Sequence, residues 1–275
     1  MSYFKFIKKF LSNQLLKVSP KIYWKRKVNY FKNNFSEVEM NLLPFLCNNQ
    51  KISLDIGAAI GVYTVNMSTY SKSVIAFEPI PKNIETIQRM ISATKVNASI
   101  ESLALSNKSG FSTMKMIDGD SGLSTIEGAN NFSTSPIKEN QSLNVVTKKL
   151  DDFNYSNIGF IKLDVEGHEI SVIEGAIKTL KNNHPNLLIE IEERHKKNAI
   201  NEMYLLLNSI GYDCFFILNK KIKSFSTFDI SQYQNIDNIG SSADNYLRKG
   251  VYINNFIFIH SNSTIKNIHE LEKLL

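Results

Sequence analysis

The fold is indicated by residues 51–64, Lys51-Ile-Ser-Leu-Asp55-Ile-Gly57-Ala-Ala-Ile-Gly61-Val-Tyr-Thr64. Within them, the pattern of apolar residues changes from that of a strand to that of a turn and then to that of a helix. The apolar run up to residue 56 indicates a buried strand, and residues 59–70 have the spacing of a helix. Between them, Gly57 permits a tight turn, and Gly61 would let the start of the helix pack close to the strand. A strand, a glycine turn and a helix in this order predict an α/β fold with a ligand crevice at the carboxyl ends of its strands.

The next strand ends in an acidic residue, which indicates the kind of ligand. Residues 73–78 form the apolar run Ser-Val-Ile-Ala-Phe-Glu, which Pro79 ends. A carboxylate at that place, Glu78, can accept hydrogen bonds from both hydroxyls of a ribose. The turn at 57–61 lacks the third glycine of a dinucleotide-binding loop, and Asp55 beside it would repel phosphate. We therefore expect a nucleoside whose substituent is cationic and carries no phosphate.

The remaining chain continues to alternate between strand and helix patterns. Such alternation is typical of βαβ units and predicts a mainly parallel sheet with helices on both faces. The Gly/Ser/Asn-rich residues 118–142 and the polar residues 219–252 are expected to be loops. Strands are predicted at 98–106, 111–117, 143–150, 157–164, 186–192, 212–218 and 254–260, and helices at 82–94, 168–181 and 196–210.

Composition excludes several classes of protein. The 275 residues are 43% hydrophobic and 21% charged, which fits one large domain with a sizeable core. No apolar run approaches the ~18 residues needed to span a bilayer, and polar residues interrupt any signal-peptide core. Cys47 and Cys214 cannot form a disulfide framework, and with five scattered histidines they show no zinc spacing. We expect a cytoplasmic protein that is at most peripheral to the inner face of the membrane.

The first 32 residues differ from the rest of the chain. They contain nine lysines and arginines and no acidic residue, so the rest carries a net charge of −3. Their apolar side chains fall on one helical face, and such a basic amphipathic helix can bind an anionic membrane. Alternatively, that face packs on the chain's own body or on a second subunit of a homo-oligomer. We expect a helical basic extension over 1–45, a main domain over 46–262 and a tail over 263–275. The apolar and aromatic residues of the extension are Phe4, Ile7, Leu11, Leu15, Tyr23, Trp24, Tyr30 and Phe31.

Further motifs follow the glycine turn in a fixed order. The most specific is Phe160-Ile-Lys-Leu-Asp164-Val-Glu166-Gly167-His168-Glu169. The chain resembles the FkbM family of class I S-adenosylmethionine-dependent methyltransferases over roughly residues 40–262. The other motifs that carry the resemblance are Leu54–Thr64, Ala76-Phe-Glu-Pro79, Ala104-Leu-Ser-Asn107, Gly122-Leu-Ser-Thr125, Val172-Ile-Glu-Gly175-Ala176 and Leu188-Ile-Glu190-Ile.

This resemblance implies a Rossmann-like methyltransferase fold with a seven-stranded sheet and S-adenosylmethionine as cofactor. Family members are mainly O-methyltransferases that act on sugars of bacterial surface glycans and glycolipids or on hydroxyls of polyketide-type metabolites. By position, the methionine side of the cofactor is expected at the glycine turn, the ribose at the second strand and the adenine near the third. The residues are Asp55, Gly57, Ala58 and Gly61 for the methionine, Glu78 and Pro79 for the ribose, Ser102 and Ala104 for the adenine, and Asp164 where donor and acceptor meet.

The reaction chemistry singles out four candidate catalytic residues. An alcohol must lose a proton as it is methylated, which calls for a carboxylate, a histidine or a metal-bound hydroxyl. Asp164, Glu166 and His168 cluster at one strand–helix turn, and Glu190 should end the neighbouring strand. Asp164 and Glu190 together could hold Mg²⁺. Glu166 and Glu169 could instead support the helix N-terminus, and His168 and His195 could be solvated surface histidines.

Two rival functions remain from the sequence. The net charge of +6 suggests nucleic-acid methylation as one alternative, but the positive charge lies in the extension. In addition, amino methyltransferases usually carry an Asn-Pro-Pro-Tyr-type element where this chain has Leu163-Asp164-Val165-Glu166. We therefore expect no nucleic-acid partner. The other rival is a binding module with a methyltransferase-like fold and no turnover, which the intact motifs disfavour. The expected acceptor is a glycan, a glycolipid or another molecule that bears a hydroxyl.

Overall fold

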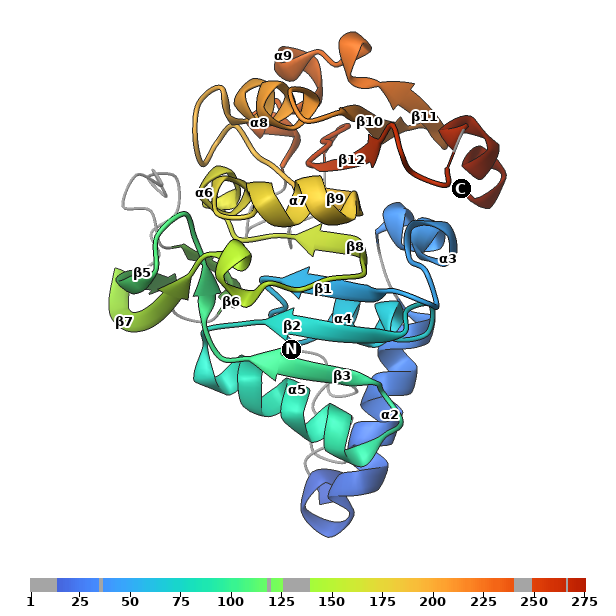
Figure 1. Cartoon of the computed structure of the whole chain (residues 1–275). Coiled ribbons are helices and arrows are strands. Elements are labelled where there is room, and N and C mark those ends of the chain that lie inside the picture. The colour runs from blue at the N-terminus through green and yellow to red at the C-terminus, as the bar shows by residue number, and fades with distance from the viewer. Residues whose placement is uncertain (1–13, 35–36, 118–119, 126–138, 240–248, 266) are drawn as a thin grey trace.

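The computed structural model describes residues 14–34, 37–117, 120–125, 139–239, 249–265 and 267–275. Two sheets and their covering helices make up this part of the chain (Figure 1). The strands are β1 (Ile52–Ile56), β2 (Ser73–Phe77), β3 (Ala98–Glu101), β4 (Ala104–Leu105), β5 (Gly110–Ile117), β6 (Asp120–Thr125), β7 (Glu139–Lys148), β8 (Ile158–Leu163), β9 (Asn186–Glu190), β10 (Tyr212–Leu218), β11 (Lys221–Ser224) and β12 (Asn255–His260).

The central sheet has the strand order β11-β10-β12-β9-β8-β1-β2-β3. Strands β9, β8, β1, β2 and β3 are parallel, and β12, β10 and β11 continue the sheet antiparallel. The mainly parallel α/β fold is thus confirmed, but the sheet has eight strands and not seven. The eighth, β11, forms a hairpin with β10 within residues 219–252, which were expected to be irregular. The alternating Lys221-Ile-Lys-Ser224 is too short for a clear period-2 signal.

A second, four-stranded sheet lies beyond the arrowheads of the central strands, at the left of Figure 1. Its order is β4-β7-β5-β6. The predicted strand 98–106 is therefore divided: β3 stays in the central sheet, and β4 pairs with β7 in the second. The predicted loop 118–142 is also partly wrong, because residues 120–125 and 139–142 belong to β6 and β7. This sheet closes one side of the crevice that the parallel strands create.

Helices cover both faces of the central sheet, as the alternation predicted. On one face lie α3 (Leu43–Leu46), α4 (Val62–Met67) and α5 (Pro81–Ala93), and on the other α6 (Glu169–Glu174), α7 (Ile177–Asn183) and α8 (Ala199–Asn208), with α9 (Ile230–Tyr233) further along. The helix predicted over 168–181 is interrupted at Gly175. A Cβ there would lie 2.1 Å from the carbonyl oxygen of Ser106, so the backbones approach too closely for any other residue.

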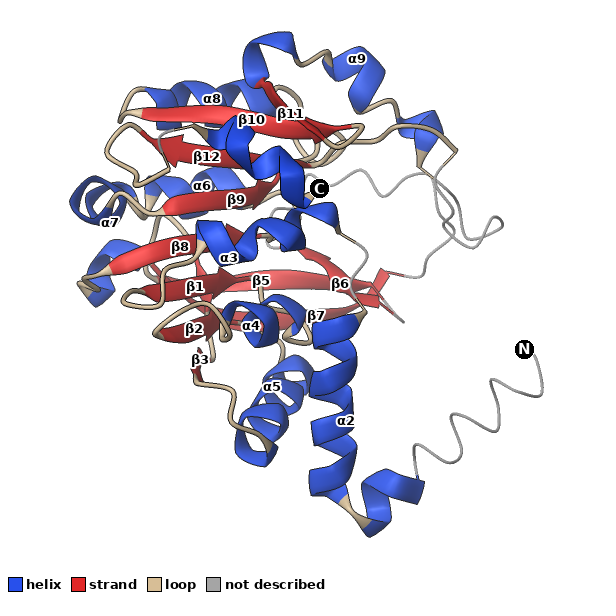
Figure 2. Ribbon diagram, turned by 90° about the vertical axis from the view of Figure 1, so that its right-hand side faces the viewer, coloured by secondary structure: helices blue, strands red, loops and turns tan. Residues whose placement is uncertain are grey.

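The N-terminal extension packs on the domain through helix α2 (Pro20–Asn33). Trp24, Val28 and Phe31 are buried against α4 and α5, beside which α2 lies in Figure 2. The Asn66 side chain donates a hydrogen bond to the Phe31 carbonyl at 3.0 Å. This part of the extension therefore packs on the chain's own body, whereas residues 1–13, with Phe4, Ile7 and Leu11, lie outside the described residues.

The C-terminal segment is more than a tail. Residues Ile268–Leu274 form a 3-10 helix whose Ile268 and Leu271 are buried in the same apolar cluster as α3. Glu272 joins this helix to β11 by accepting a hydrogen bond from the Ile222 N–H at 3.0 Å. Within the described residues, no helix is long and apolar enough to cross a membrane.

Candidate active site

The glycine turn after β1 is held by backbone contacts on both sides. The N–H groups of Gly57 and Ala58 donate to the Phe77 carbonyl at the end of β2, at 3.0 and 3.1 Å. Gly57 has φ +80°, and a Cβ on it would lie 1.8 Å from the Asp164 carbonyl oxygen. Ala59 also has positive φ, at 46°. The turn thus brings the ends of β1, β2 and β8 together, as the expected crevice requires.

Glu78 follows β2 with its carboxylate already oriented. Its two oxygens accept hydrogen bonds from the N–H groups of Ala59 and Ile80, each at 2.8 Å. The residue is only 4% exposed, and this burial raises the pKa of its carboxyl to about 7, against the lowering effect of the two amides. A carboxylate has about four acceptor positions, so the fixed group can still accept hydrogen bonds from a diol.

Asp55 supports the turn through its side chain. It is buried and accepts a hydrogen bond from the Thr64 hydroxyl on α4. Burial raises the pKa of Asp55 to about 6, although the Thr64 bond lowers it. This carboxylate therefore fixes the first turn of α4 against β1 in addition to lining a cavity.

Two cavities meet at this place. The first, of about 660 Å³ including its open mouth, has apolar walls from Leu103, Ala104 and Met114, with Glu78 and Pro79 at its edge. The second, of about 460 Å³, is more polar and is lined by Glu37, Asp55, Ala58, Tyr63 and Lys162. Gly57, Ala59 and Asp164 line both. A ligand that fills both must pass Asp164.

Two predicted cofactor residues lie outside the cavities. Ser102 is exposed and lines neither of them, because the chain leaves the central sheet after Glu101 and only re-enters a strand at Ala104. Gly61 is the N-cap of α4, with φ +83°, and a Cβ there would lie 2.9 Å from Ile87 and Met90. Gly61 therefore allows α4 to pack on α5 and not on the strand.

Asp164 and Glu190 end neighbouring strands, as predicted, with an ammonium beside both. Lys162 Nζ lies 3.5 Å from Asp164 Oδ2 and 3.9 Å from Glu190 Oε2. Glu190 also accepts a hydrogen bond from the Asn254 amide. Burial and the nearby Asp164 raise the pKa of Glu190 well above its usual value. The place where Asp164 and Glu190 together could hold Mg²⁺ is thus already next to a cation.

Glu166 and Glu169 have different surroundings in the turn after β8. Glu166 has φ +51°, a strained conformation for this residue, and its Oε2 lies 2.9 Å from His195 Nε2. It lines the first cavity, and burial raises its pKa against the hydrogen bond of His195. Glu169 is buried and accepts a hydrogen bond from the Gly167 N–H at 2.9 Å, so it supports the turn.

Both candidate histidines are buried, and their interpretation as solvated surface residues is wrong. His168 lines the first cavity, and its Nε2 lies 3.0 Å from the Ser106 hydroxyl. His195 belongs, with Glu166 and Glu192, to a cluster whose ligand-type atoms lie within 4.8 Å of one another. Glu192, however, is paired through both oxygens with Arg194. A metal ion there would have to displace a guanidinium.

Comparison with known proteins shows to which family the chain belongs. The model of the Methyltransferase FkbM domain matches residues 55–214, more than half of the chain. The chain belongs to the FkbM methyltransferase family. Its cavity-bearing domain is that of an S-adenosylmethionine-dependent methyltransferase.

Two known proteins are similar to this FkbM chain. "Methyltransferase 1" of Beauveria bassiana is 28% identical over 181 residues, which cover 58% of this chain and 71% of the relative. A crystal structure of an FkbM methyltransferase from Methylobacillus flagellatus has the same fold, with a TM-score of 0.50 and 14% identity. The match covers 90% of this chain but 54% of that protein, so the chain spans about half of its length.

The residues of the FkbM domain fit S-adenosylmethionine. The apolar first cavity suits an adenine, and the fixed carboxylate of Glu78 at its edge suits the ribose hydroxyls. The second cavity offers carboxylates and an ammonium, which suit the charged methionine end. When bound, this cofactor supplies a methyl group on a sulfonium, which is already activated for transfer.

Sequence reasoning missed three residues of the FkbM site. Ala59 lines both cavities and holds Glu78, but an alanine between glycines gave no signal. Met114 reaches the first cavity from β5, in a sheet that was not predicted to exist as such. Lys162 had a visible signal, because it is a charged residue within the otherwise apolar strand Ile-Gly-Phe-Ile-Lys-Leu.

Proposed function

We propose that this FkbM methyltransferase methylates a hydroxyl, and that the hydroxyl belongs to a sugar of a bacterial surface glycan or glycolipid. The observation that carries this proposal is the position of Asp164, whose side chain is 34% exposed and which lines both cavities. A hydroxyl must lose its proton as it is methylated, so a proton acceptor is needed next to the methyl donor. An amine acceptor would need no such base.

The residues around Asp164 have separate roles in binding the cofactor and in moving the proton. Glu78 and the walls of the first cavity orient the cofactor, and orientation supplies much of the rate in a reaction with an activated donor. Asp164 takes the proton of the acceptor hydroxyl. His168 and Glu166, whose carboxylate contacts His195, line the first cavity together with Asp164, where they orient the substrates or pass the proton on.

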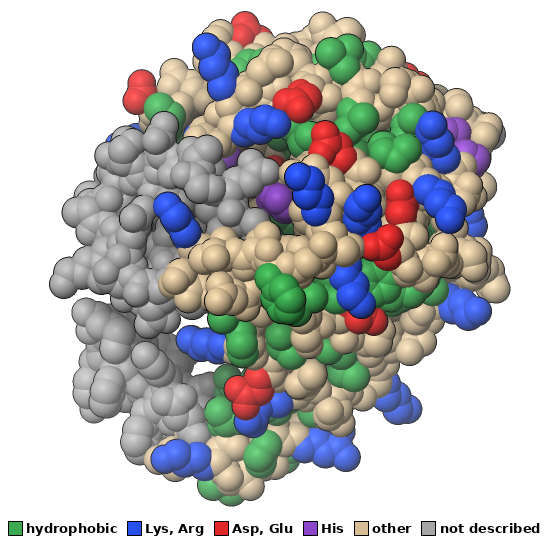
Figure 3. Space-filling model, turned by 60° about the vertical axis from the view of Figure 1, so that its left-hand side comes forward, with side chains coloured by type: hydrophobic (Ala, Val, Ile, Leu, Met, Phe, Trp, Pro, Cys, Tyr) green, Lys and Arg blue, Asp and Glu red, His purple; other side chains and the backbone are tan. Residues whose placement is uncertain are grey.

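Nucleic-acid methylation is the weaker alternative. Figure 3 shows the face toward which the carboxyl ends of the parallel strands point, and there basic and acidic side chains are interspersed over the described residues. A nucleic-acid-binding surface would gather its basic side chains into one patch or stripe. In addition, Leu163-Asp164-Val165-Glu166 offers no prolines or aromatic ring for a base.

A labelled-methyl assay tests the proposal. The purified protein and labelled S-adenosylmethionine are incubated with envelope glycans and glycolipids, and separately with total RNA and DNA, from a strain that lacks the gene. We expect label in the glycan fraction, with Asp213→Asn, an exposed carboxylate away from both cavities, as active as the wild type. Label in nucleic acid alone would overturn the proposal. Cofactor binding without transfer to any fraction would favour a binding module.

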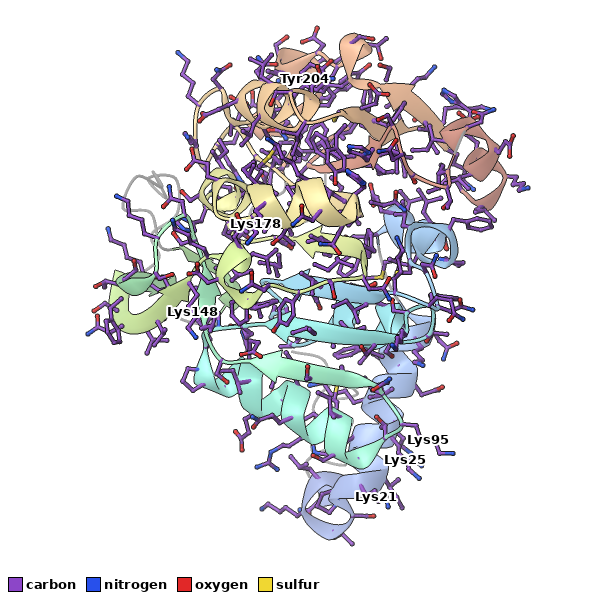
Figure 4. The ribbon with its side chains drawn as sticks, in the orientation of Figure 1. Lys21, Lys25, Lys95, Lys148, Lys178 and Tyr204 are labelled. Carbon is purple, nitrogen blue, oxygen red and sulfur yellow. The ribbon has the colours of Figure 1, made fainter. Side chains whose placement is uncertain are left out.

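We further propose that the outward face of α2 contacts an anionic membrane and so brings the domain to a lipid-linked acceptor. Lys21 and Lys25 project from the end of the molecule in Figure 4, next to Ile22, which is 48% exposed. Each basic residue near such a surface contributes about 1 kcal/mol. Lys21→Glu with Lys25→Glu should reduce sedimentation with anionic vesicles at low salt, whereas Lys178→Glu with Lys223→Glu should not. Equal losses, or no binding by the wild type, would leave α2 as a packing or dimerisation surface.

A further inference from the structure

Lys162 occupies an unusual place for a lysine. It lies in the middle of the central sheet on β8, opposite Asp55 of β1 and Leu188 of β9, and its side chain is 1% exposed. Its neighbours along the strand, Ile161 and Leu163, are buried apolar residues of the opposite face. A buried ammonium is costly unless its charge and its donors are satisfied.

The charge of Lys162 is balanced, but its donors are not satisfied. Although burial disfavours the charged form, the carboxylates of Asp164 and Glu190 raise the pKa of Lys162 above its usual value, so it stays protonated. Its Nζ lies 3.5 and 3.9 Å from those carboxylates and 5.0 Å from the centre of the Tyr63 ring. Among the described residues, Nζ makes no hydrogen bond. An ammonium has three N–H donors, and no described residue satisfies any of the three.

Lys162 is one of the residues that line the second cavity, where the methionine end of the cofactor belongs. That end carries one carboxylate and one ammonium. Glu37, Asp55 and Asp164 line the cavity with negative charge, which attracts the ammonium and repels the carboxylate. The Tyr63 hydroxyl already donates to Glu37. Among the side chains described in this cavity, Lys162 is therefore the cation to which the carboxylate can bind.

We propose that the Lys162 ammonium binds the α-carboxylate of the methionine moiety of S-adenosylmethionine. The residue thereby distinguishes the complete cofactor from nucleosides that lack this group, and it fixes the methionine chain beside Asp164. This inference rests on the cofactor of the family and is independent of which acceptor is methylated.

Titration calorimetry with two ligands tests the proposal without any acceptor. The ligands are S-adenosylhomocysteine and its decarboxylated analogue, which differ only in the carboxylate. Loss of a charge-assisted hydrogen bond should weaken wild-type binding of the analogue about 10- to 100-fold. In Lys162→Met, S-adenosylhomocysteine should lose the same factor, while the analogue should bind as before. Lys178→Met, an exposed lysine of α7 labelled in Figure 4, should retain the wild-type preference.

Two results would overturn the inference: equal binding of both ligands by the wild type, or an unchanged preference in Lys162→Met, whether both affinities stay the same or both weaken equally. Equal weakening would mean that Lys162 only balances Asp164 and Glu190. If Lys162→Met does not fold, the ¹⁵N resonance of the Lys162 ammonium in the wild type decides. It should shift with S-adenosylhomocysteine and not with the analogue. If neither ligand binds at all, the cofactor assignment itself has failed, which is a different result.

Discussion

At the scale of single residues, the site is prepared before any ligand binds. The backbone amides of Ala59 and Ile80 fix the carboxylate of Glu78. Because Glu78 is buried, little water competes for these hydrogen bonds. Asp164 is likewise placed by its backbone, because its N–H donates to the Ile56 carbonyl at 3.0 Å. Side chains that need not reorganise lose little conformational entropy when the cofactor arrives.

Glu78→Ala should weaken the binding of S-adenosylmethionine by about 1.5–3 kcal/mol, because charge-assisted hydrogen bonds to the ribose are lost. In the wild type, affinity should also fall as the pH drops below about 7, since burial raises the pKa of Glu78 to about 7 and the protonated acid accepts hydrogen bonds less well. Calorimetry at several pH values measures both effects. Glu85→Ala, an exposed acid on α5, serves as the control. An unchanged dissociation constant in a folded Glu78→Ala protein would refute the ribose assignment.

Asp164→Asn should bind the cofactor normally but turn over ~10²-fold or more slowly, because the variant keeps the shape and loses the base. The measurement is initial rate at saturating cofactor, with Asp213→Asn as the matched exposed control. If Mg²⁺ raised the wild-type rate and a chelator abolished it, Asp164 would act as a metal ligand and not as the base. Full activity in Asp164→Asn would exclude both roles.

Residue-level prediction from the sequence succeeded where a side chain's role follows from its place in a motif. Asp55, Gly57, Glu78 and Asp164 all lie at the two cavities, as expected. It failed where the role depends on a partner distant in sequence. The contact of His195 with Glu166 and that of His168 with Ser106 arise only when separate strand ends meet, so neither histidine could be recognised as buried.

At the scale of secondary-structure elements, the sequence predicted the parallel core well and the connections poorly. Strands β1, β2, β8 and β9 are mainly apolar, apart from polar residues such as Asp55 and Lys162, and such composition is typical of strands that are buried on both faces. The division of 98–106 between two sheets and the interruption at Gly175 depend on how distant backbones pack. Local propensity carries no information on such contacts.

Helix α2 offers a test of whether the extension belongs to the folded domain. Trp24→Ala should lower the free energy of unfolding by ~3–5 kcal/mol, because it leaves a cavity between α2 and α5. Tyr30→Ala on the same helix, where the side chain is 59% exposed, should change it by less than ~0.5 kcal/mol. Urea denaturation measures both. Similar small effects of the two substitutions would mean that α2 is not part of the cooperative unit.

At the scale of the whole molecule, buried acids link stability to pH. Burial raises the pKa values of Asp55, Glu78 and Glu169 to about 6, 7 and 7. Each of these carboxyls binds its proton more tightly in the folded protein than in the unfolded chain. The folded state therefore holds more protons at pH 5, and it loses stability as they dissociate. His260, whose pKa is lowered by burial, acts in the opposite direction.

The ligand-free protein should consequently be more stable at pH 5 than at pH 8. Each of the two glutamates contributes roughly 2–3 kcal/mol of this difference, given shifts of about two units. Chemical denaturation at pH 5, 6, 7 and 8 measures the trend, and Glu169→Gln should reduce its slope, whereas the exposed Glu85→Gln should not. A free energy of unfolding that stays constant or rises over this range would contradict the assignment.

The close approach at Gly57 limits how this enzyme can be redesigned. The atom that a Cβ would meet is a backbone carbonyl, that of Asp164, and not a side chain. Varying residues 57 and 164 together would therefore not make room for a side chain at position 57. Any amino acid at position 164 has the same backbone carbonyl in the same place. Substitutions are better placed on the walls of the first cavity, at Leu103 or Met114, where side chains meet side chains and volume can be exchanged, so that the enzyme accepts a cofactor with a modified adenine.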